Sequence, residues 1–425
     1  MAQQLYFSRD TKMFLEFDSF VWEIPVLDGF SFSQATNSSE ITLNEMESSA
    51  GVSRRGRRAF NDSLAPGEWS FSTYVRPYTA AGASQGTGSA DAAAEVHAVE
   101  EVLWALMAGA NNYSSSKYDK SGTDVLVPGG SSMTVNFDSS NVAQLSTFNL
   151  YFVLGNANRT VMKLDGCVVG EASIDFDIDG IATIAWSGNA ANVVDFTGST
   201  HTATSAPAYN ATSPDGTTIA VGDAFLDSDN SHKLQIVTTV PGSGTVSLGS
   251  YVNEAITTTT NFIRNRLTVL TVTPTTRDPD SDGSNELETN YSLTLTGGNV
   301  TISNNITFIT PEEIGTVNVP IGHVTGTRSV SGSFTCYLTE DTATTNASRD
   351  FFEDLRGITN VVTNSFGLVF KIGGATGTGL ELNMATSHVE IPTHSIEDVI
   401  SLETNFQALP STIDGTNELA LTYRP

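Results

Sequence analysis

Apolar and polar residues alternate along many short segments of the chain, which is typical of strands with one buried face. Turn residues (Gly, Asn and Asp) separate these segments. One segment departs from the alternation: Glu95–Met107 carries apolar residues at helical spacing. A helix of this length cannot stand alone and is expected to lie over a sheet. The pattern therefore predicts an all-β fold with a minor helical component.

The same order of segments occurs twice. In the first half it is the strands Pro66–Val75 and Phe148–Gly155, the helix between them, and the strand pair Glu171–Asp177 and Gly180–Gly188. In the second half it is Ser329–Leu338, a short helix Ser348–Leu355, Phe366–Ile372, and the pair His388–Ile391 and Asp398–Phe406. An internal duplication of this kind predicts two tandem domains, 1–188 and 261–425. The Thr/Ser/Gly-rich region 189–260 between them is either an insertion or a small β-subdomain.

Composition limits the function classes. The net charge is −27 and the pI is about 4.3, which argues against a nucleic-acid-binding protein, because such proteins carry a basic stripe. The acidity is compatible with a surface that repels nucleic acid, and equally with solubility alone. The N-terminus lacks a basic region and an apolar run, and no stretch reaches the length of a membrane helix. We therefore expect no signal peptide and no membrane partner.

An acidic loop is the one candidate for metal binding. Asp278, Asp280 and Asp282 alternate, and Gly283 follows. This spacing lets carboxylate oxygens converge on calcium, but Thr289 stands where a bidentate Glu is expected. A solvated hairpin tip is the alternative.

A second acidic group lies on an expected strand. Asp175, Asp177 and Asp179 alternate with apolar residues, so a period of two places the three carboxylates on one face of a sheet. Their counterparts in the second half are Glu397, Asp398 and Glu403. If the sheet curves around a channel, this acidic row lines it; otherwise it faces outward and aids solubility.

A third feature is a basic run within this acidic chain. Arg54, Arg55, Arg57 and Arg58 supply four of the 20 basic residues, on a segment we expect to be a loop. Arginine forms bidentate contacts with carboxylates, so pairing with acidic residues of a neighbouring subunit is favoured over nucleic-acid binding. No catalytic motif occurs, and Cys167 and Cys336 are expected to be small core residues.

Four features occur in a fixed order along the chain: the opening Trp22–Ser33, the long loop before Pro66–Pro77, the lone helix at Glu95–Met107, and the closing Ile174–Trp186. This ordered set resembles the tail tube (major tail) proteins of long-tailed bacteriophages. The resemblance covers about 1–188 and 261–425 but not the region between.

The resemblance implies two tandem tail-tube-type β-sandwich or half-barrel domains, each with a flanking short helix, plus the β-rich insertion. It implies self-assembly: six such domains form a ring, so a duplicated chain forms trimeric pseudo-hexameric rings that stack into a hollow tube. Genomic DNA passes through this tube without specific binding. The expected further partners are the tape measure protein, the proteins of the tube ends and, in sheathed tails, the sheath. No cofactor or enzymatic activity is expected, and the place is the virion tail, after assembly in the host cytoplasm.

Three other classes of protein remain open. A β-rich surface adhesin shares the Thr/Asn-rich composition but is expected to carry a signal peptide. A carbohydrate-active enzyme is expected to expose aromatic residues beside paired carboxylates, whereas the four tryptophans lie within strand or helix patterns. Another virion structural protein, such as a decoration or tube-end protein, is the nearest alternative.

Overall fold

The structure is a computed structural model. It describes residues 5–42, 57–80, 94–114, 117–137, 144–155, 159–203, 218–227, 233–241, 246–253, 261–274, 290–314, 316–340, 347–357, 366–413 and 415–425. Strands dominate these residues, so the prediction of an all-β fold with a minor helical component is confirmed.

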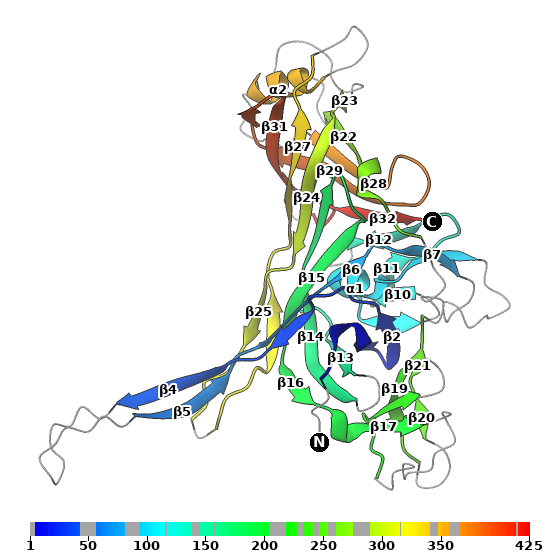
Figure 1. The fold of residues 1–425 in the computed structure, drawn as a ribbon, viewed down its shortest axis with the longest axis vertical. Helices are drawn as coiled ribbons and strands as arrows, with labels where there is room; N and C mark the ends of the chain where they lie inside the picture. The colour runs from blue at the N-terminus through cyan, green and yellow to red at the C-terminus, as the bar shows by residue number, and fades with distance from the viewer. Residues whose placement is uncertain are drawn as a thin grey trace, which may run out of the picture.

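The molecule is organised around one long antiparallel sheet, which we call the wall. Figure 1 shows its strands running along the long axis, with the rest of the body packed on one side. In hydrogen-bonded order the wall consists of β3 (Ser31–Ser33), β6 (Gly67–Tyr74), β15 (Thr183–Ala190), β14 (Thr160–Asp177), β24 (Leu295–Ser303), β27 (Ser329–Tyr337), β31 (Ile400–Ala408) and β30 (Thr393–Ile396). Of β14, the residues from Glu171 to Asp177 contribute to the wall between β15 and β24.

The strands of the two chain halves pair in the same order. In the first half the order β1 (Lys12–Phe17), β13 (Phe148–Leu154), β14, β15, β6, β3 is antiparallel throughout. In the second half β22 (Val269–Pro274), β28 (Phe366–Ile372), β29 (Gly379–Val389), β31, β27, β24 repeats it. Strand β30 continues the path of β29 beyond Pro392 and pairs with β31 as the end of β14 pairs with β15.

Strands β2 (Phe20–Ile24), β1 and β13 and the first part of β14 form a sheet outside the wall, which we call the first outer sheet. It is buried on both faces. In β1, Met13, Leu15 and Phe17 belong to the main core, whereas Phe14 between them belongs to a second core. The neighbouring strands β13 and β2 divide their apolar residues in the same way. Burial on both faces explains why the sequence here reads as continuous apolar runs rather than strict alternation.

The region between the two halves contains a small sheet that makes this second core. Its strands are β17 (Thr200–Ala203), β18 (Ala224–Asp227), β19 (Leu234–Thr239) and β20 (Ser247–Leu248), and β21 (Ser250–Tyr251) adds in parallel to β2. Ala224, Leu226, Leu234 and Ile236 pack on Phe14 and Val21. The small sheet therefore covers the face of the first outer sheet that is turned away from the main core. Strand β16 (Asn192–Asp195) follows β15 in the chain, pairs antiparallel with β14 and leads into the small sheet.

The remaining strands join the two halves at one side of the body. C-terminal strand β32 (Ala420–Arg424) pairs with β29 and also with β12 (Met133–Asn136). Beyond β12 the sheet continues through β11 (Thr123–Val127), β10 (Lys117–Lys120) and β9 (Asn112–Ser114), and β23 (Tyr291–Ser292) pairs with β22.

The described residues include two α-helices, α1 (Glu101–Met107) and α2 (Ser348–Gly357). The predicted helix Glu95–Met107 is therefore wrong in its first turn, because Glu95–Ala98 form strand β8, which pairs with β7 (Pro77–Ala80). Every residue of α1 is buried. Packing rather than intrinsic propensity holds so short a helix.

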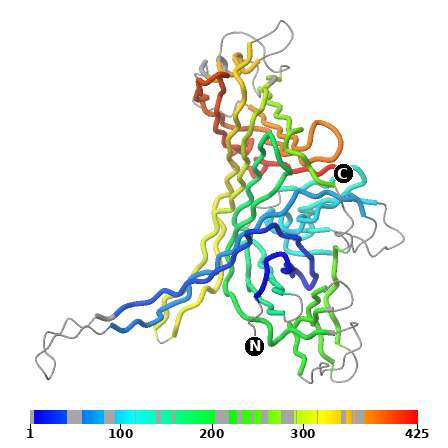
Figure 2. Tube along the Cα trace, viewed as in Figure 1, coloured from blue at the N-terminus to red at the C-terminus, as the bar shows by residue number. Residues whose placement is uncertain are grey.

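Two antiparallel ribbons leave the lower end of the wall. The longer one, β4 (Thr36–Thr42) with β5 (Arg57–Leu64), projects far from the body as an arm (Figures 1 and 2). The shorter one, β25 (Ile306–Ile309) with β26 (Gly322–Thr325), starts beside its base. In the sequence, β4 and β5 come between the wall strands β3 and β6, and β25 and β26 come between the corresponding wall strands β24 and β27. The region before Pro66 is thus a strand pair in its described part, not the expected loop.

All four tryptophans and both cysteines are buried, as the sequence predicts. Burial raises the pKa of the Cys336 thiol to about 12 and that of Cys167 well above its usual range. Neither described helix is long and apolar enough to cross a membrane.

Candidate channel face and assembly surfaces

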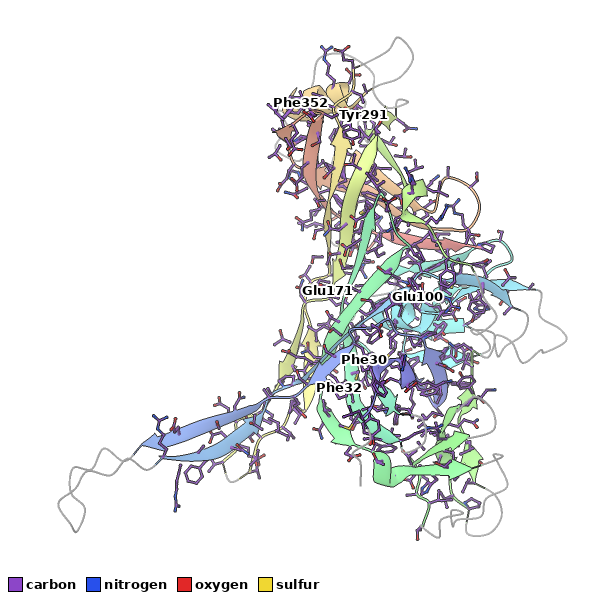
Figure 3. The ribbon with its side chains drawn as sticks, in the orientation of Figure 1. Phe30, Phe32, Glu100, Glu171, Tyr291 and Phe352 are labelled. Carbon is purple, nitrogen blue, oxygen red and sulfur yellow. The ribbon has the colours of Figure 1, made fainter. Side chains whose placement is uncertain are left out.

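The wall has one apolar and one polar face. Along β14, Ala172, Ile174 and Phe176 are buried in the main core. Glu171, Asp175 and Asp177 alternate with them and are exposed on the opposite face. Figure 3 shows Glu171 on the wall, on the side away from the body that holds Glu100. The predicted alternation is confirmed up to Asp177.

The polar face carries acids and small polar groups. On β6 and β31, the residues that point to this face include Glu68 and Glu403. The residues of the other wall strands on this face are mainly serine, threonine and asparagine. The eight wall segments contain five carboxylates and no lysine or arginine: Glu68, Glu171, Asp175, Asp177 and Glu403. Because no basic residue neutralises them within the sheet, this face is anionic.

Two of the carboxylates influence each other. Partial burial, together with the charge of Asp177, raises the pKa of Asp175 above its usual range. The two residues are two apart on the strand and share one face, so the Asp177 charge disfavours the ionised form of Asp175.

The other predicted acidic residues lie at hairpin ends. Asp179 lies beyond the end of β14, where its carboxylate approaches Arg266 at 3.6 Å. Ile178 is exposed, so the period-two pattern ends before it and the expectation that Asp179 shares the sheet face of Asp175 is wrong. Glu397 and Asp398 lie in the turn between β30 and β31 and are exposed. Only Glu403 of the second-half set lies on a wall strand.

The basic run is divided by the structure. Arg57 and Arg58 begin β5, opposite Thr42 and Ile41, whereas Arg54 and Arg55 lie outside the described residues. Arg57 forms an exposed ion pair with Glu40 of the same arm, at 3.3 Å. Such an exposed pair adds little stability. Both described arginines are therefore presented to solvent on the arm.

The base of the arm is tied to the shorter ribbon. The backbone amide of Leu64 donates to the carbonyl of Asn318 at 2.8 Å, and the backbone amide of Asn318 donates to the carbonyl of Asp62 at 3.2 Å. The ribbon β25–β26 and its connection expose a group of large apolar side chains: Ile309, Ile314, Val317, Val319, Ile321 and Val324. Exposed apolar patches of this kind mark interaction surfaces.

The predicted metal loop, Asp278, Asp280 and Asp282, lies outside the described residues. Within the described part of the chain, no group of three or more His, Cys, Asp or Glu side chains is arranged to hold a metal ion.

A buried polar cluster was not anticipated from the sequence. The Tyr423 hydroxyl donates to Glu100 Oε1 at 2.6 Å and accepts from Trp104 Nε1 at 2.7 Å. Burial, opposed in part by the Tyr423 hydrogen bond, raises the pKa of Glu100 to about 7. Since Tyr423 belongs to β32, this cluster connects the C-terminal strand with α1. No sequence signal could have joined residues more than 300 positions apart.

Beside it lies a second buried set on the same helix. Glu101 accepts from Tyr118 at 3.0 Å, and its other oxygen lies 3.0 Å from His97 Nδ1. Burial lowers the pKa of His97, but the Glu101 charge and hydrogen bond outweigh it, so the net shift is upward. These buried contacts connect α1 with β8 through His97 and with β10 through Tyr118.

Almost the whole chain is similar to a known phage protein. The tail tube protein pb6 of Escherichia phage T5 is 28% identical over 400 residues, which cover 93% of this chain and 69% of the relative. The resemblance to phage tail tube proteins is confirmed. No family model matches the chain. The alignment with the tail tube relative spans both halves and the region between them, so it reaches further than the segments on which the sequence resemblance rests.

Proposed function

We propose that this chain is the structural subunit of a phage tail tube, with two tandem domains, 1–188 and 261–425, and an insertion, 189–260, that covers the first. The tail tube relative supports the role in the virion. The observation that carries the proposed architecture is the repeated order of strands, in which β3-β6-β15-β14 and β24-β27-β31-β30 are successive four-strand units of one wall.

In this proposal the polar face of the wall lines the channel. Five carboxylates without a lysine or arginine in the wall segments repel phosphate at short range. They also avoid the counterion-release binding that basic residues produce. Glu171, Asp175, Asp177, Glu68 and Glu403 are the lining carboxylates in this arrangement, and Asp179, Glu397 and Asp398 lie at its rims.

The ring is a trimer of chains with pseudo-sixfold symmetry. Each chain supplies two four-strand units, so three chains supply the six units that the resemblance implies. Closing the sheet on itself also removes the exposed edges that an open sheet presents to solvent.

The arm and the shorter ribbon make the contacts between rings. A two-stranded ribbon that is exposed on both faces is marginally stable by itself, which favours a bound state for the arm in the assembly. The arginines of the arm then meet carboxylates of a neighbouring ring, and the apolar side chains of β25–β26 become covered.

This function needs no enzymatic activity and no cofactor. The subunit acts with copies of itself and with other tail proteins, namely those of the tape measure, the tube ends and, where present, the sheath. It is assembled in the host cytoplasm and resides in the virion tail.

Negative-stain images of the purified chain test the proposal. Hollow rods or stacked rings are expected, and mass measurement of single rings is expected to give three chains. Isolated globular particles under all assembly conditions would contradict the tube function. Rings of six chains would contradict only the duplicated, trimeric arrangement.

A further inference from the structure

The wall ends in two strand edges, β3 at one end and β30 at the other. In the described residues, β3 pairs with β6 alone and β30 pairs with β31 alone. Ser31, Ser33 and all four residues of β30 are exposed. An exposed strand edge is a template for pairing with another strand.

The chain contains an example of how two of its units join. At the centre of the wall, β14 of the first unit pairs antiparallel with β24 of the second, from Glu171 opposite Ser303 to Asp177 opposite Gly297. The hydroxyls of Ser173 and Thr301 lie 3.1 Å apart across this junction. The joint therefore has a fixed register and a polar pair on the channel side.

The register of the central junction predicts which residues would lie opposite each other if the two ends of the wall paired. Val75 N donates to Ala182 O at the same place in the first unit where Leu338 N donates to Ile400 O in the second. Starting from these two equivalent bonds, each wall residue of the first unit can be matched with its counterpart in the second unit by counting along the paired strands. Ser33 opposite Glu68 then corresponds to Thr301 opposite Ser331, and Thr393 opposite Glu403 corresponds to Ser173 opposite Ala185.

We propose that β30 of one copy pairs antiparallel with β3 of the next copy, with Thr393 opposite Ser33 and Ser395 opposite Ser31. This pairing repeats the register of the central junction. It rests on the proposed function, because it specifies how the chains of a ring join, and it assigns the strands and residues at that joint.

The side chains at the two edges fit this register on both faces. On the polar face, Thr393 and Ser33 reproduce the hydroxyl pair of Ser173 and Thr301 with the two residue types exchanged. On the core face, Ile396 comes opposite Phe30, which stacks on Phe152 at 5.4 Å between ring centroids. Ile396 is 78% exposed in the single chain, so the pairing would cover a large apolar side chain.

The geometry of the joint favours a closed ring. The two edges are different surfaces at opposite ends of the wall, so the contact is head-to-tail and each copy uses both edges. A head-to-tail contact generates a ring when its rotation closes. Every junction between successive four-strand units, whether within a chain or between chains, then has the same strand pairing.

Cysteine pairs test the register. Ser33→Cys/Thr393→Cys should form a disulfide between neighbouring chains upon mild oxidation of assembled tubes, because directly opposite residues bring their Cβ atoms to about 4.5–5.5 Å. Ser173→Cys/Thr301→Cys is the matched control within one chain. Ser31→Cys/Thr393→Cys lies on the same face but two residues out of register and should cross-link at least about tenfold less, since diagonal neighbours are about 7–8 Å apart. Both native cysteines are buried.

The outcomes separate this inference from the proposed function. Covalent dimers and trimers with the Ser33/Thr393 pair, and few with the out-of-register pair, are the expected result. If tubes are seen in the microscope but only the out-of-register pair or neither pair cross-links, the joint is wrong while the tube function stands. If the wild-type chain forms no ring or tube, the tube function itself fails.

Amide hydrogen exchange of the unmodified chain gives a second measurement that needs no variant. Amides in 30–33 and 393–396 should exchange about tenfold or more slowly in tubes than in unassembled subunits, because bonded strand amides are released only by opening. Unchanged exchange in both segments on assembly would overturn the pairing.

Discussion

Gly188 lies directly opposite Trp69 in the wall, and the indole ring occupies the space that a side chain at Gly188 would need. A Cβ at Gly188 would lie 2.5 Å from Trp69 Cζ2 and still closer to the carbonyl oxygen of Val168 on β14. The corresponding pair in the second unit is Gly332 opposite Phe406, where a Cβ on the glycine would lie 2.8 Å from Phe406 Cζ. The large residue is on β6 in one unit and on β31 in the other. The two units thus fill the same place in the core from opposite strands.

We predict that Gly188→Ala destabilises the unassembled chain by about 1–3 kcal/mol, the usual cost of overpacking a core. The added methyl group must displace the Trp69 ring and also move β15 away from the Val168 carbonyl of β14. Equilibrium urea unfolding followed by tryptophan fluorescence measures the change. Gly198→Ala is the control, since a Cβ there meets no atom within 4 Å. Equal free energies of unfolding for the two variants would contradict the prediction and would show that the strands adjust to the added methyl group.

Glu100 predicts a dependence of stability on pH. Its pKa is about 7 in the folded chain, above the value of 4.5 for an unperturbed carboxyl group, so the folded state binds the proton more tightly. The stabilisation is fully present below about pH 4.5 and is lost as the pH rises through about 7. Glu100→Gln should remove this loss, with a gain over wild type of at most about 3 kcal/mol at pH 8 relative to pH 5.

Denaturant unfolding of the unassembled subunit at both pH values measures this effect. His97 also has a raised pKa, but it is present in both proteins, so its contribution cancels in the comparison. Tyr423→Phe is a useful second variant, because it removes the hydrogen bond to Glu100 without changing a carboxylate. If Glu100→Gln and wild type keep a constant difference in unfolding free energy between pH 5 and pH 8, the assignment of the pKa is wrong.

The sequence predicts the fold best where one face of a strand is buried and the other is wet. The alternation from Glu171 to Asp177 and the positions of Trp69 and Trp186 follow from period two, because each second residue meets the core. It predicts less where burial is unusual. Phe14 and Tyr151 are buried under the small sheet of the insertion, so their strands carry no alternation from which a face could be read.

Features that depend on distant partners were beyond reach of the sequence. Tyr423 contacts Glu100 only because β32 is inserted between strands of the two chain halves. Strand β5 of the arm lies in the segment expected as a loop, because the sequence there shows no apolar period. The strands of the arm are defined by backbone pairing with each other. The end of the acidic row before Asp179 likewise depends on where the hairpin turns.

The arm predicts a role for its arginines in assembly. Replacing Arg54, Arg55, Arg57 and Arg58 with Ser should shorten the tubes. The circular dichroism spectrum should stay unchanged, because Arg57 and Arg58, the two that lie in the described residues, are exposed. Tube length in electron micrographs and dissociation with increasing salt measure the effect. Arg57→Ser/Arg58→Ser and Arg54→Ser/Arg55→Ser, made separately, distinguish the strand pair from the other two. Tubes of normal length and salt resistance in the quadruple variant would contradict the prediction.

The acidic face of the wall predicts an effect on DNA passage. Asp177→Lys should leave tubes assembled, because the Asp177 side chain is exposed and its replacement points away from the core. Each lysine in the channel can hold a passing phosphate through counterion release, so DNA ejection should slow, and the slowing should diminish as salt is raised. Phage particles that carry the variant subunit, with ejection triggered in solution and followed by a DNA dye, measure the rate. Asp10→Lys makes the same charge change at an exposed position in the 3-10 helix Ser8–Asp10, off the wall, and is the matched control. Slower ejection in Asp177→Lys alone supports an inward-facing acidic row; equal rates in the two variants would place Asp177 outside the path of the DNA.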